Sequence, residues 1–483
     1  MSSTASALIQ KVWNYAHVLR DDGLALMDYT EQITYLLFLK MNWEQSHEAS
    51  QEIPSLYTWG TLKNITDDKK RLDRYHQALR KLSDCPGLLG LIFAKPQSKI
   101  NDPAKLHYLM QIIDSENWSE LDVDVKGEVY EGLLARNAED VRGGAGQYFT
   151  PRPVIRAIVE VMRPKPMMRI SDPACGTGGF LMAAFDYLKD RTSNAKESAF
   201  LHTEAFHGID LVSNVARLCA MNLFLHGIGA NPKHPVVTIG DSLELRPKVC
   251  PLVDMVLTNP PFGKKSSYTI IGENGKNLTD KISYHRPDFW ATTSNKQLNF
   301  VQHIYSMLKE TGRAAVVVPD NVLFESGAGE KIRRVLLQRC DVHTLLRLPT
   351  GIWYSPGVKA NVLFFDKNPV SKTPSTKEVW VYDLRSNRNY SLKNNPIRSD
   401  DLFDFIHSYC ADDRSKRKQT DHFRRFKYAE IIARDKANLD IHWQQEAQKL
   451  FNGSTPQTLM REILADLDEA MKEFAAAEYE IQK

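Results

Sequence analysis

The stretch "VDMVLTNPPFGKK", residues 253–265, decides how this chain folds. Its first half is an apolar run with strand character, and the run stops at Asn259, which two prolines and a phenylalanine follow. Neither proline can donate a ladder hydrogen bond, and Pro260 disfavours helix at Asn259, so the strand ends in a stiff, extended corner. An ordinary turn is the alternative, because Asn-Pro alone is a common turn signal. Four such residues directly after a strand favour a corner that fixes where the Asn259 side chain points.

Length and composition predict a soluble globular protein. With 483 residues, 42% of them hydrophobic, the chain can bury a large core, and we expect roughly two to four domains. The net charge of +3 is too small to indicate a nucleic-acid partner, although a basic groove can lie within a balanced total. The apolar run at residues 34–39 is far shorter than the roughly 20 residues of a membrane span, so we expect no membrane contact and a cytoplasmic location. The cysteines stand singly, which favours neither a zinc site nor a disulfide framework, and we expect no metal.

Three blocks follow one another along the chain. Residues 1–145 carry apolar residues at helical spacing and predict a helical N-terminal domain. In residues 146–394, β-rich runs alternate with helical ones, which predicts an α/β domain with a mostly parallel sheet covered on both faces. The expected strands lie in "MMRISDPAC", "AFHGIDLV", "PVVTIGDSL", "VDMVLTNPP", "RAAVVVPD", "DVHTLLRLP" and "NVLFFDK". Residues 395–483 are expected to form a helical C-terminal region for subunit docking.

Polar and glycine residues follow three of the expected strands. The first strand runs into "DPACGTGGFL", residues 172–181, whose glycines suit a tight turn and the close approach of a ligand to a helix N-terminus. The turn lacks the full dinucleotide fingerprint, and the chain has no phosphate loop ending in Gly-Lys-Ser/Thr, so neither a dehydrogenase nor an ATPase is favoured. The next strand ends at Asp210, where a carboxylate accepts hydrogen bonds from ribose hydroxyls, and Asp241 and Ser242 after the third could border an adenine ring. Either carboxylate alone would be a turn former, but successive strand ends favour a ligand site.

Five motifs together resemble one protein family. The series "GGAGQYFTPRPV", "DPACGTGGFL", "GID", "GDSL" and "NPPF", in this order, is similar to the methylation subunits of type I restriction-modification systems, which are S-adenosylmethionine-dependent DNA adenine methyltransferases. The likeness covers nearly the whole chain, from "LRDDGLALMDYTEQITYLLFLKM" near the start to "NLDIHW" near the end. It implies a Rossmann-like methyltransferase domain between a helical N-terminal domain and a helical tail. It also implies double-stranded DNA, a DNA-specificity subunit, an ATP-dependent restriction subunit and a second copy of this chain as partners.

The resemblance assigns cofactor roles as well. In the family, the segment matching residues 147–152 covers the methionine end of S-adenosylmethionine, the glycine-rich turn cradles it, and the acidic residue matching Asp210 binds its ribose. Many relatives have glutamate there, so Asp210 has a shorter reach but keeps the charge. The expected cofactor residues are Gln147, Tyr148, Phe149, Thr150, Pro151, Arg152, Asp172, Gly176, Thr177, Gly178, Gly179, Asp210, Asp241 and Ser242.

The corner at residues 259–262 then has a chemical role. The 6-amino group of adenine is a poor nucleophile, because its lone pair is delocalised into the ring. If the Asn259 side-chain oxygen and the Pro260 carbonyl accept its two hydrogens, the lone pair turns toward the sulfonium methyl group. Phe262 would stack on a base flipped out of the duplex, and Asn259, Pro260, Pro261 and Phe262 are the expected catalytic residues. A carbon methyltransferase would need a cysteine nucleophile, and the chain has no Pro-Cys dipeptide.

Several alternatives stay open. Residues 264–296 could be a lid or a DNA-contacting loop, or a disordered surface segment. The basic cluster at residues 416–427 could follow a DNA backbone, but a solvated face is commoner. An apolar stripe in residues 457–474 suits docking to a partner helix or packing on its own domain. The other functions considered are an amino-methyltransferase acting on RNA or protein glutamine, and a non-catalytic cofactor-binding assembly subunit. No repeated target-recognition domain is visible, so the sequence does not reveal the recognised DNA site.

Overall fold

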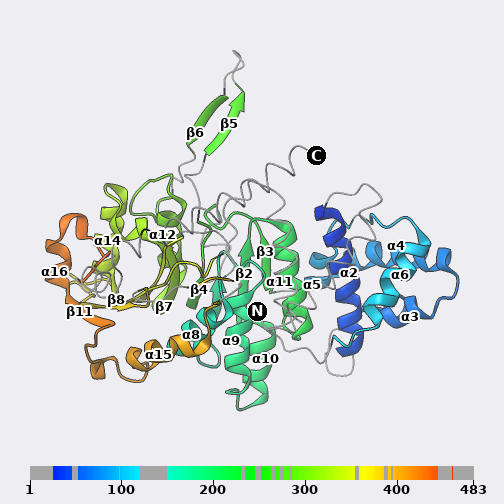
Figure 1. The fold of residues 1–483 in the computed structure, drawn as a ribbon, viewed down its shortest axis with the longest axis horizontal. Coiled ribbons are helices and arrows are strands. Elements are labelled where there is room, and N and C mark those ends of the chain that lie inside the picture. Colours follow the sequence, from blue (N-terminus) through cyan, green and yellow to red (C-terminus); the bar gives the residue numbers. More distant parts are fainter. Residues whose placement is uncertain are drawn as a thin grey trace. The chain divides into compact units, whose positions relative to one another are not determined.

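A nine-stranded sheet with helices on both faces forms most of the described protein, and a set of helices precedes it (Figure 1). The computed structural model describes residues 26–45, 53–96, 98–118, 150–229, 234–244, 252–262, 267–271, 277–281, 286–353, 358–385, 390–392, 395–443 and 460. The chain divides into two units, Met1–Leu439 and Asp440–Lys483, and the sheet belongs to the first.

The helices of the N-terminal part begin where the sequence supplies caps. Asp67 accepts a hydrogen bond from the Lys70 amide at 2.8 Å, and Asp102 accepts one from Ala104 at 2.8 Å in front of a proline at the first helical position. The helices are α2 (Leu26–Gln45), α3 (Trp59–Asn64), α4 (Asp68–Ser83), α5 (Gly87–Ile92) and α6 (Pro103–Asp114). The helices predicted within residues 1–145 are confirmed by these five, while residues 1–25 and 119–145 lie outside the described residues.

The sheet contains all seven predicted strands and two more. Its strands are β1 (Ile170–Asp172), β2 (Phe206–Asp210), β3 (Val237–Ile239), β4 (Val253–Thr258), β7 (Leu308–Pro319), β8 (Cys340–Arg347), β9 (Ala360–Lys367), β10 (Glu378–Asp383) and β11 (Phe423–Lys427). They lie in the order β11-β10-β8-β9-β7-β4-β1-β2-β3. Only β9 and β11 run antiparallel to their neighbours among these strands, so the prediction of a mostly parallel sheet is confirmed.

Two groups of helices cover the sheet. Because crossovers between parallel strands are right-handed, α9 (Gly179–Lys189) and α11 (Ser213–Leu225) share one face. The helix α8 (Arg152–Met162) packs on α9, and α15 (Phe403–Tyr409) packs on α8. On the other face α12 (Lys296–Met307) packs on α14 (Ala328–Arg339), and Figure 1 shows α12 and α14 across the strands from α8 and α15. The remaining helices are α10 (Ala195–Thr203), α13 (Asp320–Phe324) and α16 (Tyr428–Ala433).

Two regions differ from what the sequence pattern suggested. Residues 423–427 were expected in a helical region, but they form β11, which pairs antiparallel with β10 from Tyr382↔Phe423 to Glu378↔Lys427. Within residues 264–296, β5 (Ser267–Ile271) and β6 (Asn277–Lys281) pair as an antiparallel hairpin. The boundaries of the three predicted domains remain a prediction.

Every helix in the described part of the chain is too short or too polar to cross a bilayer.

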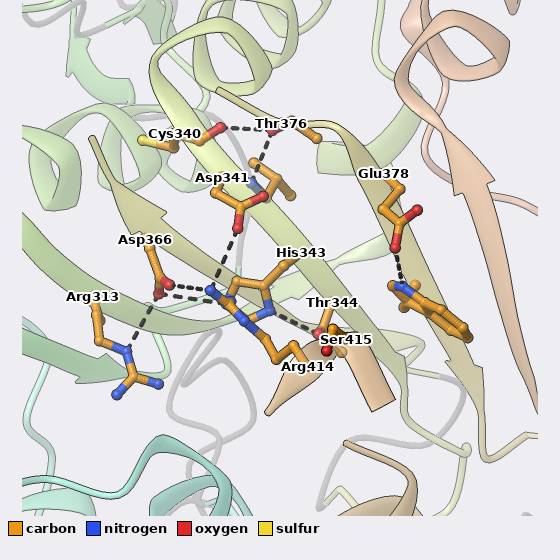
Figure 2. A network of polar contacts seen from close by, with 12 residues as sticks. Arg313, Cys340, Asp341, His343, Thr344, Asp366, Thr376, Glu378, Arg414 and Ser415 are labelled. Carbon is orange, nitrogen blue, oxygen red and sulfur yellow. Dashed lines mark hydrogen bonds and ion pairs between the residues drawn. The ribbon is translucent and has the colours of Figure 1, made fainter. Parts of the chain in front are cut away.

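A polar cluster ties the C-terminal part of the first unit to the sheet (Figure 2). Arg414 donates to Asp366 at 2.7 Å and lies 3.4 Å from Asp341, while Arg313 donates to the other oxygen of Asp366 at 3.3 Å. Burial lowers the pKa of His343 to about 3, so the imidazole beside Asp366 is neutral at neutral pH. The cluster joins the first residues of β8 to the end of β9, at the sheet edge opposite Asp172 and Asp210.

Candidate active site

The glycine-rich turn between β1 and α9 has the backbone that its sequence predicts. Gly176 and Gly178 have φ values of +55° and +89°, in the left-handed region that favours glycine. A Cβ at Gly178 would lie 2.9 Å from Cys219 Sγ, and one at Gly179 would lie 2.9 Å from Arg152 Nη1. The turn is therefore packed tightly against α11 and α8. On its other side, a Cβ at Gly176 would meet no described atom within 4 Å, which leaves room for a ligand.

Asp210, the last residue of β2, holds the turn in place. Its Oδ2 accepts a hydrogen bond from the Gly176 amide at 3.0 Å, and its Oδ1 accepts one from the Val212 amide at 2.8 Å. Burial raises its pKa, and the two amides act in the opposite direction. Each carboxylate oxygen has a second lone pair, so the group can still accept from a ligand hydroxyl.

Asp172, the last residue of β1, is buried below the turn. Its Oδ1 accepts from Thr258 Oγ1 at 2.6 Å and from the Ala174 amide at 3.0 Å. Burial raises the pKa of Asp172 to about 7, the two hydrogen bonds lower it, and the nearby charge of Asp210 raises it further. Asp172 therefore links the turn to the end of β4 from beneath.

The corner after β4 is held by three other elements. Asn259 Nδ2 donates to Thr150 Oγ1 at 2.9 Å, just before α8, so the amide oxygen lies on the opposite side of the amide group. The Pro261 carbonyl accepts from Gln297 Nε2 at 3.1 Å, at the start of α12. Phe262 is buried and meets Trp353 edge to face, with ring centroids 6.0 Å apart. The corner is thus held by contacts from several elements, and Thr150 orients the side chain of Asn259.

The two polar residues after β3 form hydrogen bonds within the protein. Ser242 is buried and donates inward to the Pro173 carbonyl, so its hydroxyl supports the turn. Asp241 is half-buried and accepts from the Leu243 amide at 2.9 Å. Between the two acidic strand ends, two apolar side chains face solvent, Leu211 with 62% and Ile239 with 42% exposure. This exposed pair suits a flat aromatic ligand.

The fold gathers all the described site residues at the carboxyl ends of the parallel strands, which form one end of the sheet. Thr150, Pro151 and Arg152 reach it from the start of α8, whereas Gln147, Tyr148 and Phe149 lie outside the described residues. Sequence reasoning missed the supporting side chains of Gln297 and Trp353, for which no local pattern exists. It also missed Leu211, although an apolar residue directly after an acidic strand end is a usable signal. Among the described residues, no group of three or more His, Cys, Asp or Glu side chains could hold a metal ion.

Comparisons with known proteins agree with this geometry. The model of the N-6 DNA methylase family matches residues 121–451, and that of the HsdM N-terminal domain matches residues 8–113. The EcoKI methylase subunit of the type I restriction enzyme of Escherichia coli K12 is 36% identical, over 97% of this chain and 94% of its own. The StySPI methylase subunit of Salmonella potsdam is also 36% identical, with the same coverage.

Solved structures give the same result. The EcoKI M protein is 32% identical with a TM-score of 0.55, over 99% of this chain and 96% of its own. A modification subunit of a putative type I restriction enzyme from Vibrio vulnificus is 26% identical with a TM-score of 0.71, over 88% and 93%. The fold and the family match therefore define a DNA adenine methyltransferase. Within that class, the chain belongs to the N-6 DNA methylase family and to the methylase subunits of type I restriction enzymes.

Proposed function

We propose that this chain transfers the methyl group of S-adenosylmethionine to the 6-amino group of adenine in DNA, with Asn259 and Pro260 activating the amine. One observation carries the proposal. Thr258 Oγ1 donates to Asp172 at 2.6 Å, so the glycine-rich turn and the Asn259 corner are neighbours at one edge. A methyl donor on the turn and an amine at the corner would then lie close enough to react.

The residues around the turn fit S-adenosylmethionine. The open side of Gly176 leaves space beside the backbone, and Asp210 would accept from the ribose hydroxyls. Leu211 and Ile239 would flank the adenine, because both are apolar and exposed next to acidic strand ends. Bound S-adenosylmethionine supplies an electrophilic methyl group on a sulfonium. Asp172 remains a positioning residue, since its carboxyl is buried under the turn.

The corner residues prepare the amine. The Asn259 side-chain oxygen and the Pro260 carbonyl accept hydrogen bonds from the two N–H groups of the amine, which turns the nitrogen lone pair toward the methyl group. After the transfer, the methylated nitrogen loses one proton to solvent. Thr150 sets the orientation of Asn259, and Gln297 holds the carbonyl of Pro261, the residue after the Pro260 acceptor, so the corner is held before the base arrives. Phe262 stacks on the flipped base.

DNA is favoured over RNA or protein glutamine, because the matching family is the N-6 DNA methylases. We infer that a separate DNA-specificity subunit supplies sequence recognition, that an ATP-dependent restriction subunit joins the larger complex, and that each complex holds two copies of this chain. The names of the relatives, which are methylase subunits of type I restriction enzymes, support membership in an enzyme of several subunits. We also infer a cytoplasmic location, where such a complex meets DNA.

Two substitutions in the assembled complex separate the two halves of the site. Asn259→Ala should leave S-adenosylmethionine affinity within a few-fold and lower methyl transfer by roughly a hundredfold or more, because the lost contact is made mainly in the transition state. Asp210→Ala should weaken cofactor affinity by tens of fold, because a hydrogen bond to a charged group is worth about 1.5–3 kcal/mol. Calorimetry measures binding, and transfer of tritiated methyl groups to duplex DNA measures activity.

The matched control is Asp254→Ala. Asp254 lies at the other end of β4 and pairs with Lys309 at 2.8 Å, so its loss should leave cofactor affinity unchanged. Near-normal turnover by the Asn259 variant, or equal cofactor affinities in the two Asp variants, would contradict these assignments.

A further inference from the structure

We propose that Arg385 is a positioning residue for the target-base pocket, acting through the loop that carries Trp353. The inference rests on the proposed function, in which Phe262 contacts the flipped base. Arg385 lies two residues beyond the end of β10. Its role is to fix the loop whose residue Trp353 packs against the Phe262 ring.

The Arg385 side chain is only 10% exposed and joins three strand ends at the active-site edge. Its Nη1 and Nη2 donate to the two oxygens of Asp320 at 3.0 and 2.6 Å, directly after β7. Its Nε donates to the Leu348 carbonyl at 2.9 Å, directly after β8. Its Nη2 also donates to the Ala360 carbonyl at 3.0 Å and to Asn361 Oδ1 at 3.2 Å, at the start of β9.

Two of these acceptors are the two ends of one loop. Leu348 and Ala360 flank residues 349–359, and the Leu348 amide donates to the Ala360 carbonyl at 3.0 Å, which closes the loop at its base. The guanidinium bonds both carbonyls and Asp320, so the base of the loop is held at a set distance from the end of β7. Since β7 lies beside β4, this also sets the loop against the strand that ends at Asn259.

The near side of the loop reaches the base pocket. Trp353 is 2% exposed and meets Phe262 edge to face at 6.0 Å. Gly351 has φ +78°, and a Cβ there would lie 1.9 Å from the Tyr390 carbonyl oxygen, so the loop is packed tightly against the Tyr390 backbone at this residue. Trp353 follows the loop base at Leu348 by five residues, so a shift at the base would change its contact with Phe262.

A buried ion pair of this kind is an uncertain source of stability, because desolvation offsets much of its attraction. The bidentate geometry and the additional carbonyl contacts instead fix the position of the loop base relative to β7. A planar guanidinium fixes such a position better than an ammonium group, because its donors have set directions. The chain contains a comparison for this point. Arg414 also bridges β8 and β9 through Asp341 and Asp366, but at the opposite sheet edge, away from the base (Figure 2).

Arg385→Lys and Arg414→Lys form a matched pair, since each keeps the charge and loses the fork. Both variants would be made in the full chain and assembled with the specificity subunit. The DNA site of the wild-type complex is first mapped by sequencing of N6-methyladenine, and the variants are then assayed on a duplex that carries this site. We expect Arg385→Lys to lower kcat/KM for DNA roughly tenfold or more, because small displacements of reacting groups are costly. The fluorescence of 2-aminopurine at the target position should fall as well, with S-adenosylmethionine affinity within twofold of wild type. Arg414→Lys should lower the thermal midpoint without either change.

Equal losses of kcat/KM in the two variants would overturn the inference, as would a fall in cofactor affinity in Arg385→Lys. If Arg385→Lys does not assemble, Asp320→Asn tests the same contact with an isosteric change, and unaltered 2-aminopurine fluorescence would overturn the inference. A wild-type complex that methylates DNA, loses activity with Asn259→Ala and keeps it with Arg385→Lys would overturn this inference alone. An inactive wild-type complex would overturn the proposed function together with it.

Discussion

Asp172 is a carboxyl group that the fold has removed from water. It is 1% exposed, and burial raises its pKa to about 7, whereas an unfolded aspartate titrates near 4. The folded protein therefore retains a proton there that the unfolded chain has lost. The stability that this proton contributes is fully present below pH ~4 and is lost as the pH rises through about 7.

This sign gives a prediction for the protein without cofactor. Asp172→Asn keeps an Oδ1 that can accept from Thr258 and Ala174 but carries no charge at any pH. The variant should gain stability relative to wild type between pH 5 and 8, by up to about 4 kcal/mol. Urea unfolding at several pH values measures the difference, and Asp254→Asn, on the neighbouring strand β4, is the control for losing a carboxylate at another place in the sheet. Parallel stability curves for wild type and Asp172→Asn would show that Asp172 is ionised throughout.

At the scale of the element, α11 joins the cofactor turn to the N-terminal helices. Asn222 Nδ2 donates to the Thr177 carbonyl at 2.9 Å, and its side chain is buried in an otherwise largely apolar helix. Elsewhere on the helix, Arg217 pairs with Glu31 of α2, and Phe224 meets Phe38 edge to face at 5.4 Å. One helix therefore positions the turn and anchors the helical N-terminal part.

Asn222→Leu should separate these two roles. It removes the donor to the Thr177 carbonyl while keeping the branched shape of the side chain, and losing such a contact typically costs about 1–3 kcal/mol. We expect S-adenosylmethionine affinity to fall roughly tenfold, with kcat at saturating cofactor close to wild type. Phe224→Leu is the control, because it weakens the packing on Phe38 and should lower only the thermal midpoint. A fall in kcat with unchanged cofactor affinity would contradict a role for Asn222 at the turn.

At the scale of the whole molecule, the open question is where the specificity subunit binds. The first unit ends at Leu439, and the stripe of Leu459, Ile463, Leu467, Met471 and Phe474 follows in the second. We propose that this stripe is the docking surface. Deleting residues 457–483 retains the buried Ile441, so the truncated chain should still fold and bind S-adenosylmethionine.

The truncated chain should no longer co-purify with the specificity subunit or methylate DNA specifically. A matched pair of substitutions refines the test: Ile463→Asp lies within the stripe and should prevent assembly, whereas Met460→Asp lies beside it, at a residue with 59% exposure, and should not. A truncated chain that still forms the complex would exclude the stripe, and one that aggregates would assign the stripe to the protein's own core.

Local rules predicted the features of the sequence that are local in the structure. The seven apolar runs became strands, and the glycines of residues 176–179 and the prolines after Asn259 ended two of them as expected, because periodicity, φ freedom and missing amide donors act within a few residues. The parallel sheet then put Asp172, Asp210 and Asn259 at one edge without further information, since parallel strands end on the same side.

Only the tertiary structure decided which distant side chains support that edge. Thr150 and Asn259 are 109 residues apart, and Asn222 reaches Thr177 from another helix, so no sequence spacing reports either contact. The charged run of β11 is a strand because β10 offers it an edge to pair with, which its own composition does not indicate. Arg385 gains its partners in the same way, because the ends of β7, β8 and β9 meet around it only after the sheet has formed.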